Sequence, residues 1–264
     1  MSIDIAICVK PVPELDKIQF DPTTKVIRRT PGESVLNPLD KNALELARQL
    51  KECTDCTITL VSMAPPSAEI NLREALARGG DKVYHLSDRA FAGGDAFATS
   101  YTLSEALKQL GKFDLIITGE YSSDGGTNLV AAQIGEWMGM EHIHNVREFE
   151  LTDRKFFAVS EADGKQICWK GTLPVLISVS RSINTPRAVG IREILAAKRK
   201  PYSIWTAKDI PTLNHNYIGK DGSPTHTGDM NPIESGRVCK VMKDDPPKLA
   251  ENIIRILRET GINI

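Results

Sequence analysis

The sequence from Phe113 to Met140, FDLIITGEYSSDGGTNLVAAQIGEWMGM, decides the fold of this chain. Its opening run, FDLIIT at 113–118, is short, apolar and rich in β-branched residues, which predicts a buried strand. Small and polar residues follow from Gly119 to Thr127 and predict a loop. From Leu129 to Met138 apolar residues recur at helical spacing and stop at Gly139, which predicts a helix with a glycine C-cap. The stretch is therefore a strand, a loop and a helix, the unit of α/β proteins.

The loop of this unit is suited to bind a phosphate group. The first N–H groups of a helix have no partner within the helix, and they lie at the positive end of its dipole. Gly125 and Gly126 lack a Cβ, so a ligand can come close to the backbone there. The same pattern also occurs in strand-to-helix turns that bind nothing, and the loop alone leaves both interpretations open.

The composition of the chain excludes several classes of protein. Its 264 residues carry a formal net charge of −1, which gives no support for nucleic acid as a partner, because phosphate backbones attract basic surfaces. No apolar run approaches the ~20 residues that cross a bilayer, and the chain enters its first strand without a signal-peptide pattern. Five cysteines are an odd number without framework spacing, so we expect reduced thiols and a cytoplasmic protein.

Strands and helices alternate along the first 140 residues. Strands are expected at 3–9, 57–63, 82–86 and 113–118, and helices are expected to begin near residues 38, 67, 96 and 129. A small antiparallel excursion, a hairpin from Ile18 to Arg29 with its turn at Asp21 to Thr24, interrupts this order. The order predicts a doubly wound, mostly parallel sheet with right-handed crossovers, the Rossmann-like type that binds adenine nucleotides.

The pattern changes after residue 140. Turn residues separate three short runs, which predict an antiparallel meander at 146–151, 155–159 and 166–170. The run PVLISV at 174–179 predicts a strand that rejoins the sheet. Arg181 to Lys200 then carries six basic residues with Ile191, Ile194 and Leu195 among them, so this stretch is either a solvated face or a docking surface.

The last part of the chain differs in composition from the rest. After Pro201 it reads as an extended arm, followed by an amphipathic helix at 248–260. We therefore divide the chain into an α/β domain, residues 1–200, and a C-terminal arm with a helix, residues 201–264. An arm of this composition cannot bury itself and implies a partner chain.

The chain carries no recognisable catalytic motif. The patterns H-E-x-x-H, G-x-S-x-G and the Rossmann G-x-G-x-x-G are absent, and the H-x-H of His142 and His144 is more typical of surface histidines than of a metal site. Asp88, Asp95 and Asp124 are candidates to converge at one sheet edge, although helix capping alone would explain Asp95.

Five loops are nevertheless expected to meet at the carboxyl edge of the sheet. They are rich in Gly, Ser, Thr, Asp and Pro, and they comprise residues 8–12, 37–40, 63–66, 87–99 and 119–127. Such loops predict a nucleotide site without a catalytic group. That description suits a protein that binds a redox cofactor, because the cofactor supplies the chemistry.

Motifs along nearly the whole chain resemble those of the beta subunits of electron-transferring flavoproteins. Each motif is weak alone, but together they are specific: V-K-x-V-P at 9–13, N-P-x-D at 37–40, V-S-M-x-P-P at 61–66, L-R-x-A-L-A-x-G-x-D at 72–81, D-G-x-T at 124–127, P-R at 186–187 and A-K-x-K at 197–200. The sequence departs from the family at Tyr121, Gly126 and Leu129, where Gln, Asp and Gln are usual. Tyr121 either stacks on a ring or fills space.

The family divides into two kinds, and the resemblance implies one of them. In the housekeeping kind this subunit holds AMP as a structural ligand, whereas in the electron-bifurcating kind it holds a second FAD and docks NADH. The run Ser87 to Ser100, with the pattern S-D-R-x-F-x-G-x-D-x-x-A-T-S, resembles the bifurcating kind. The resemblance thus implies a chain that binds FAD, takes a hydride from NADH and sends one electron to ferredoxin. The other electron passes through the FAD of an alpha subunit to an acyl-CoA-type or other flavin dehydrogenase.

The resemblance also assigns residues to the site. The expected cofactor contacts come from the loops at the carboxyl edge of the sheet: Cys8, Val9, Lys10, Pro11, Val12, Asn37, Asp40, Met63, Ala64, Asp88, Phe91, Gly93, Gly94, Asp95, Ala96, Thr99, Gly119, Tyr121, Ser122, Ser123, Asp124, Gly125, Gly126, Thr127, Asn128 and Val130. The dehydrogenase is expected to dock at Ile191, Ile194 and Leu195. Two alternatives stay open: a housekeeping carrier with AMP in the site, and a stand-alone nucleotide-binding protein.

Overall fold

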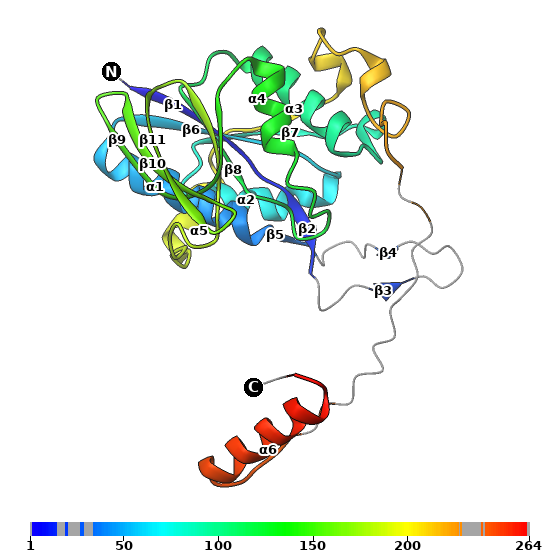
Figure 1. Ribbon diagram of the computed structural model, residues 1–264. Helices are drawn as coiled ribbons and strands as arrows, with labels where there is room; N and C mark the ends of the chain where they lie inside the picture. Colours follow the sequence, from blue (N-terminus) through cyan, green and yellow to red (C-terminus); the bar gives the residue numbers. More distant parts are fainter. Residues whose placement is uncertain are drawn as a thin grey trace. The chain divides into compact units, whose positions relative to one another are not determined.

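The computed structural model describes residues 2–14, 19–20, 27–28, 34–226, 228, 239 and 241–262. The chain forms two compact units, Met1–Asp229 and Met230–Ile264. Within the described residues, the first unit contains a nine-stranded sheet that is covered by helices (Figure 1). Across the sheet the strands are β11 (Lys165–Thr172), β10 (Lys155–Ala162), β9 (His142–Thr152), β12 (Val175–Val179), β8 (Leu115–Gly119), β1 (Ile3–Cys8), β6 (Cys56–Met63), β7 (Lys82–Leu86) and β13 (Tyr202–Trp205).

The direction of the strands confirms a doubly wound, mostly parallel sheet. Every neighbouring pair from β9 to β13 is parallel, and only β9, β10 and β11 form an antiparallel meander. The chain first builds β1, β6 and β7 in one direction and then crosses to β8 on the other side of β1. The strand order therefore reverses between β1 and β8, which is where open α/β sheets bind their ligands.

The sheet continues beyond the expected domain boundary. The composition after Pro201 predicted an extended arm, but β13 pairs in parallel with β7, and the first unit continues to Asp229. A strand of four residues is too short to show a clear alternation of apolar and polar side chains. Its place in the sheet depends on its partner strand rather than on its own sequence.

The predicted excursion follows β1. Short strand β2 (Pro11–Pro13) pairs with β5 (Ser34–Leu36), and β3 (Gln19–Phe20) pairs with β4 (Ile27–Arg28), both antiparallel. The antiparallel pair of β3 and β4 confirms the expected hairpin. Its predicted turn at Asp21 to Thr24 lies outside the described residues.

Helices cover the two faces of the sheet. Helices α1 (Pro38–Cys53), α2 (Glu69–Ala77) and α5 (Ile191–Ala197) lie on one face, and α3 (Ala96–Leu110) and α4 (Val130–Met138) lie on the other. Gly139 ends α4 with a φ of +62°, which confirms the glycine C-cap expected from the sequence.

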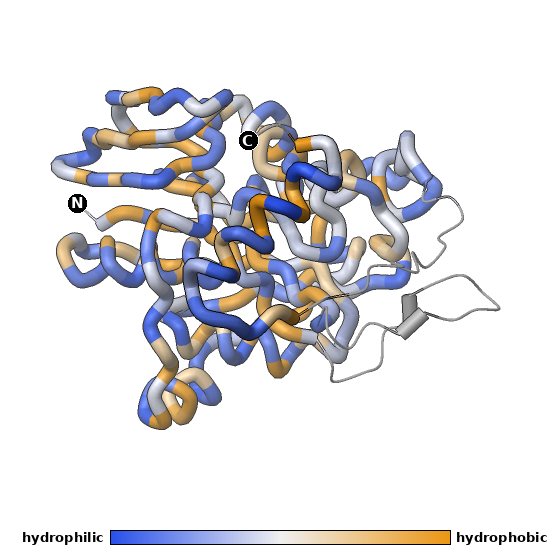
Figure 2. Tube along the Cα trace, turned by 60° about the horizontal axis from the view of Figure 1, so that its bottom comes forward, coloured by the Kyte–Doolittle hydropathy of each residue, from blue (hydrophilic) through white to orange (hydrophobic). Residues whose placement is uncertain are grey.

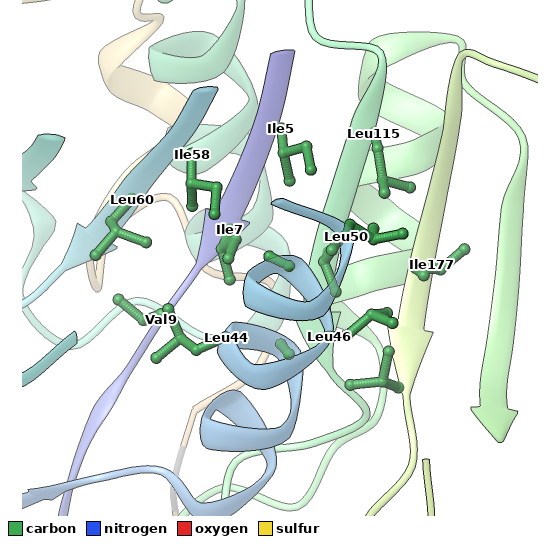
Figure 3. Close-up of a cluster of buried hydrophobic side chains, with 14 of the residues drawn as sticks. Ile5, Ile7, Val9, Leu44, Leu46, Leu50, Ile58, Leu60, Leu115 and Ile177 are labelled. Atoms are coloured by element: carbon green, nitrogen blue, oxygen red, sulfur yellow. The ribbon is translucent and has the colours of Figure 1, made fainter. Parts of the chain in front are cut away.

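The side chains of β1 alternate between these two faces. Ile5 and Ile7 join the apolar cluster under α1, whereas Ala6 and Cys8 join the cluster under α3 and α4. Figure 3 shows the first cluster, where Leu44, Leu46 and Leu50 of α1 lie beside strand side chains such as Ile7. A strand that is buried on both faces explains why IDIAIC is apolar except at Asp4, the one exposed residue of the strand. This core holds the ends of β1 and β8, and with them the site, in fixed positions.

The second unit contains helix α6 (Pro246–Glu259), which begins two residues before the helix expected at 248–260 and ends one residue before it. Near the C-terminus the tube in Figure 2 changes repeatedly between hydrophilic and hydrophobic colours. The helix has exposed apolar side chains at Ile253 and Ile254. No helix among the described residues is long and apolar enough to cross a membrane.

Candidate functional site

A cluster of polar residues lies where the strand order reverses. Its members come from the ends of β1 and β8 and from the start of α1, and we call it the switch-point cluster: Lys10, Asn37, Asp40, Gly119, Ser122 and Asp124. The sequence analysis assigned all six to the nucleotide site. The structure brings them together.

Asn37 joins the three loops of this cluster. Its side-chain amide donates to the Asp40 carboxylate over 2.9 Å and to the Tyr121 carbonyl over 2.9 Å, while its own oxygen accepts from the Ser123 N–H over 3.2 Å. Its backbone N–H donates to the Lys10 carbonyl. Because Asn37 uses its side chain in this way, it makes no side-chain cap for α1, although it occupies the N-cap position.

Asp40 is the buried carboxylate of the cluster, with 4% of its surface exposed. It accepts the Lys10 N–H over 2.6 Å and the Asn37 amide over 2.9 Å. Burial raises the pKa of Asp40 to about 7, and the hydrogen bonds from Asn37, Lys10 and Gly119 oppose that shift only in part. Asp40 therefore titrates close to neutral pH and fixes the position of the loop that follows β1.

Gly119 is required by the close approach of β8 to α1. A Cβ at this position would lie 2.5 Å from Asp40 Oδ1, 2.9 Å from the Leu39 Cβ and 3.1 Å from the Asp40 nitrogen. No larger residue fits without moving the start of α1. The glycine that follows the apolar run IIT is thus explained by packing and not by ligand approach.

The loop after β8 presents groups that suit a phosphate. The Lys10 ammonium donates to Asp124 over 2.7 Å and to Ser122 over 3.2 Å, which places a cation beside the loop. Gly126 has a φ of +60° and Asn128 a φ of +56°, and Gly125 to Asn128 are exposed. The chain turns there into α4, whose first N–H groups receive no side-chain cap from Leu129.

An unsatisfied polar atom lies at the end of the same strand. Within the described residues, the buried hydroxyl oxygen of Thr118 has no hydrogen-bond partner, and Thr118 pairs in register with Cys8 on β1. Buried polar groups normally have a partner. A cation and uncapped N–H groups suit the phosphate end of an adenine nucleotide or of FAD, whereas the Thr118 hydroxyl is covered by protein atoms.

Other residues assigned to the nucleotide site have different surroundings. Val9 and Val12 are buried in the core, so their backbone groups are what a ligand could contact. Burial, and then the charge of Asp40, raises the pKa of the Cys8 thiol to about 12, which makes it unreactive at neutral pH. Tyr121 is exposed, so it does not fill space in the core.

The predicted cofactor-binding residues of the loop Ser87–Ser100 are held by hydrogen bonds other than those of the switch-point cluster. Asp88 accepts the Ala90 N–H over 3.0 Å and so caps a short 3-10 turn, Arg89–Phe91. Asp95 accepts the Ala98 N–H over 3.0 Å and caps α3. The Asp95 cap confirms the structural alternative weighed from the sequence. Phe91 is buried beneath the loop in the cluster under α3.

Both carboxylates also bind a distant segment, residues 206–226, which we call the clasp segment. The second oxygen of Asp88 accepts the Ala207 N–H over 3.0 Å. The second oxygen of Asp95 accepts the Thr225 N–H over 3.0 Å and the Thr225 hydroxyl over 2.6 Å. The hydrogen bonds from Ala90 and Ala207 hold the pKa of Asp88 below its ordinary value.

The clasp segment was not assigned to the site by the sequence analysis. Its contacts join residues that are far apart in the sequence; Asp95 and Thr225, for example, are separated by 130 positions. No local pattern marks such a pair, and the segment contains only short 3-10 turns at Ala207–Asp209 and His215–Tyr217. The run Asp221 to Pro224 was interpreted as part of an arm, because its composition is typical of a loop.

No metal site is present in the part of the chain that the structure describes, since no three His, Cys, Asp or Glu side chains lie close enough to share an ion. His142 and His144 instead share the hydroxyl of Ser178, at 3.2 Å and 3.0 Å. Burial, and then the charge of His144, lowers the pKa of His142 to about 4. Ser178 is buried, His142 half-buried and His144 exposed, so the H-x-H motif belongs to a hydrogen-bond network at the surface.

The expected docking residues lie on α5 and are exposed. Ile191 exposes 78% of its surface, Ile194 47% and Leu195 56%. The basic residues nearby are partly neutralised, because Arg187 donates to Glu45 and to Glu52, each over 2.7 Å. The exposed surface of α5 therefore combines these apolar side chains with the exposed Arg192.

A mostly parallel sheet with polar loops at its strand reversal is the arrangement in which α/β proteins bind nucleotides. The model of the electron transfer flavoprotein domain family matches residues 24–210, and the chain belongs to this family. It is 34% identical over 262 residues to the electron transfer flavoprotein subunit beta of Thermoanaerobacterium thermosaccharolyticum, with 98% of this chain and 100% of that protein covered.

Two further relatives agree with this assignment. The chain is 37% identical to the electron transfer flavoprotein subunit beta of Clostridium acetobutylicum, with 97% of this chain and 98% of that protein covered. It is 36% identical to the caffeyl-CoA reductase-Etf complex subunit CarD of Acetobacterium woodii, with 84% of each chain covered. These findings confirm the resemblance to electron-transferring flavoprotein beta subunits.

Proposed function

We propose that this chain is the beta subunit of an electron-bifurcating flavoprotein. A bound FAD would supply the chemistry, accepting a hydride from NADH and releasing one electron to ferredoxin and the other, through the FAD of an alpha subunit, to a partner dehydrogenase. The residues of this chain would bind and orient the cofactor. We expect the complex to work in the cytoplasm.

The loop Ser87–Ser100 carries this proposal. Its sequence resembles the bifurcating kind, and its two aspartates fix its two ends, Asp88 at the 3-10 turn and Asp95 at α3. Between them Gly93 has a φ of +72° and is exposed, and Gly94 is partly exposed. Because both carboxylates are occupied by protein groups, we expect backbone atoms, Ala96 and Thr99 to make the flavin contacts.

The switch-point cluster would hold the adenine and phosphate end of the nucleotide. Lys10 is placed to neutralise phosphate charge, and the first N–H groups of α4 would donate to phosphate oxygens. Asn37 and Asp40 would act indirectly, because their hydrogen bonds hold the loops after β1 and β8 against each other.

The partner dehydrogenase, of the acyl-CoA type or another flavin dehydrogenase, would dock on α5. The exposed Ile191 provides an apolar anchor of the kind that dominates binding energy at interfaces. A relative named as a subunit of a caffeyl-CoA reductase-Etf complex supports a reductase as the class of partner. The second unit, with exposed Ile253 and Ile254 on α6, would pack on the alpha subunit.

The second candidate function is a housekeeping carrier with AMP in the site. The switch-point cluster favours neither ligand, because the phosphate-binding groups would serve AMP and FAD alike. A stand-alone nucleotide-binding protein is less well supported, since the relatives are named as subunits.

Anaerobic titration of the purified complex with NADH tests the proposal. We expect NADH to bleach the flavin absorbance, and a flavin that stays oxidised would contradict the proposal. The variant Ile191→Asp should slow electron transfer to the dehydrogenase while the cofactor content stays unchanged. Ile70→Asp is the matched control, because Ile70 on α2 is similarly exposed. Lost cofactor in Ile191→Asp would point to misfolding instead.

A further inference from the structure

The two aspartates of the loop Ser87–Ser100 share one arrangement. In each, one carboxylate oxygen caps the helical turn that the residue begins, and the other accepts from the clasp segment. Asp88 meets Ala207 near the start of that segment, and Asp95 meets Thr225 near its end. The clasp segment is therefore attached to both ends of the loop, and neither carboxylate keeps an oxygen that is free of protein donors.

Further contacts fix the middle of the loop to the same segment. The Lys220 N–H donates to the Ala92 carbonyl over 3.0 Å, and the Asp95 N–H donates to the Ser223 hydroxyl over 2.9 Å. Ser223 is buried and donates in turn to the Gly219 carbonyl over 2.7 Å. The loop thus has backbone and side-chain hydrogen bonds to the clasp segment at residues 88, 92 and 95.

Glycine at position 219 makes this contact possible. Its φ is +60°, and a Cβ there would lie 2.2 Å from the Ala90 carbonyl oxygen. The backbone of the clasp segment at Gly219 is therefore in direct contact with the backbone of the loop at Ala90. The loop cannot change its path unless the clasp segment moves as well.

We propose that Thr225 and Ser223 are positioning residues for the cofactor, acting through Asp95. Their hydrogen bonds hold the Asp95 backbone and carboxylate where α3 begins, and so set the path of Gly93 and Gly94 toward the cofactor. This inference rests on the proposed function, which gives the loop to FAD. The clasp segment then sets how tightly this subunit holds its cofactor, although it carries no group that touches it.

The strength of the Thr225 bond makes the effect measurable. A hydroxyl that donates to a carboxylate over 2.6 Å is a charge-assisted hydrogen bond, and such bonds are roughly twice as strong as neutral ones. Thr225→Val removes this donor but keeps the shape of the side chain and the backbone N–H that also binds Asp95. Thr225→Ser keeps the hydroxyl.

The experiment compares these variants in the full complex with the alpha subunit. We expect Thr225→Val to weaken binding of the cofactor in the beta subunit by about tenfold, the effect of one lost hydrogen bond to a charged group. We expect Thr225→Ser to restore most of the affinity and the alpha-subunit flavin to stay in place. Thr212→Val is the matched control, because Thr212 is an exposed residue of the same segment whose hydroxyl makes no hydrogen bond within the described residues.

Amide hydrogen exchange provides a second measurement that does not depend on which cofactor is bound. In Thr225→Val the peptides that cover residues 88–98 should exchange faster, while those that cover 115–135 stay unchanged. Unchanged exchange and unchanged affinity in Thr225→Val would overturn the inference, as would a Thr225→Ser variant as weak as Thr225→Val. If the wild-type complex holds AMP in place of FAD, the proposed function fails. Faster exchange at residues 88–98 in Thr225→Val would still support the inference that the clasp segment holds the loop through Asp95.

Discussion

The switch-point cluster and the loop Ser87–Ser100 use aspartate in opposite ways. Asp40 is buried, and burial raises its pKa to about 7. Asp95 is partly exposed; burial alone would raise its pKa, but hydrogen bonds from Thr225 and from the Ala98 N–H outweigh this and hold the pKa below its ordinary value. Both residues follow a strand and begin a helix, so the sequence makes them look alike.

The difference shows what each region depends on. In the switch-point cluster the carboxylate organises groups that face a possible ligand, and Lys10 and the loop after β8 carry the polar atoms. In the loop Ser87–Ser100 the carboxylates organise the protein itself, through the clasp segment. An aspartate beside a nucleotide site is thus not by itself a ligand for the nucleotide.

The largest effect on stability is expected from Gly119→Ala. The new Cβ would lie 2.5 Å from Asp40 Oδ1, which cannot move away without losing its hydrogen bond from Asn37, and 2.9 Å from the Leu39 Cβ, which cannot move without shifting α1. We expect a loss of about 3 kcal/mol in the free energy of unfolding, the upper range for overpacking, together with loss of bound nucleotide. Denaturant unfolding of the complex measures the first effect and cofactor release the second.

The control for this variant is Gly228→Ala, because a Cβ at Gly228 meets no atom within 4 Å of it among the described residues. If Gly119→Ala were as stable as Gly228→Ala, the close packing of β8 against α1 would not be what holds the switch-point cluster together.

The next effect is expected from Asp40→Asn. The new amide would turn an N–H group toward donors that now bind the carboxylate, which should cost about 1–3 kcal/mol. The pKa of Asp40 is raised on folding, so protonation stabilises the folded state fully below pH ~4, and this contribution is lost as the pH rises to about 7. In thermal unfolding of the wild type, the free energy of unfolding should fall by up to about 4 kcal/mol between pH 4 and pH 7, and the variant should lack this fall.

A variant whose pH dependence between 4 and 7 matches that of the wild type would show that Asp40 stays ionised in the folded protein. In that case its hydrogen bonds would outweigh its burial, and the contrast with Asp95 would disappear.

A smaller loss of stability, with the opposite pH dependence, is expected from Asp95→Asn. Asparagine also caps helices well, so we expect a loss of only about 0.5 kcal/mol at neutral pH. The pKa of Asp95 is lowered on folding, so its contribution is present above pH ~4 and is lost as the pH falls through the folded pKa. The stability of the variant should therefore depend less steeply on pH in the acid range than that of the wild type. An equally steep dependence would argue against the hydrogen bonds between Asp95 and the clasp segment.

The smallest effect on stability is expected from Lys10→Met. The Lys10 side chain is 46% exposed, so solvent screens its ion pair with Asp124, and the pair should contribute about 1 kcal/mol. The loss of a cation beside the phosphate site should nevertheless weaken nucleotide binding by about tenfold. Calorimetric titration of the nucleotide-free complex with AMP, compared with adenosine, tests this. Equal affinity of variant and wild type for AMP would remove Lys10 from the site.

The sequence predicted the regular part of the fold well, because local patterns determine it. The helix at Ala96–Leu110 begins where its Asp95 cap predicts, and β7 has its expected bounds. The switch-point cluster was predictable for the same reason, since carboxyl ends of parallel strands meet at one edge.

What could not be predicted depends on contacts between distant residues. Strand β13 is defined by its pairing with β7, and the clasp depends on bonds such as Thr225 to Asp95. A stretch such as Asp221 to Pro224 has the composition of a loop whether it extends into solvent or covers another loop. Cys8 and His142 were visible as residue types, but only burial explains why the Cys8 thiol stays protonated and the His142 imidazole stays neutral at neutral pH.

Release of cofactors from the purified complex with its alpha subunit, by denaturation and chromatography, tests the central claim most directly. Our account predicts two FAD and no AMP for each heterodimer, with one flavin bound between the loop Ser87–Ser100 and the switch-point cluster. One FAD and one AMP would contradict it and would identify the chain as the beta subunit of a simple carrier.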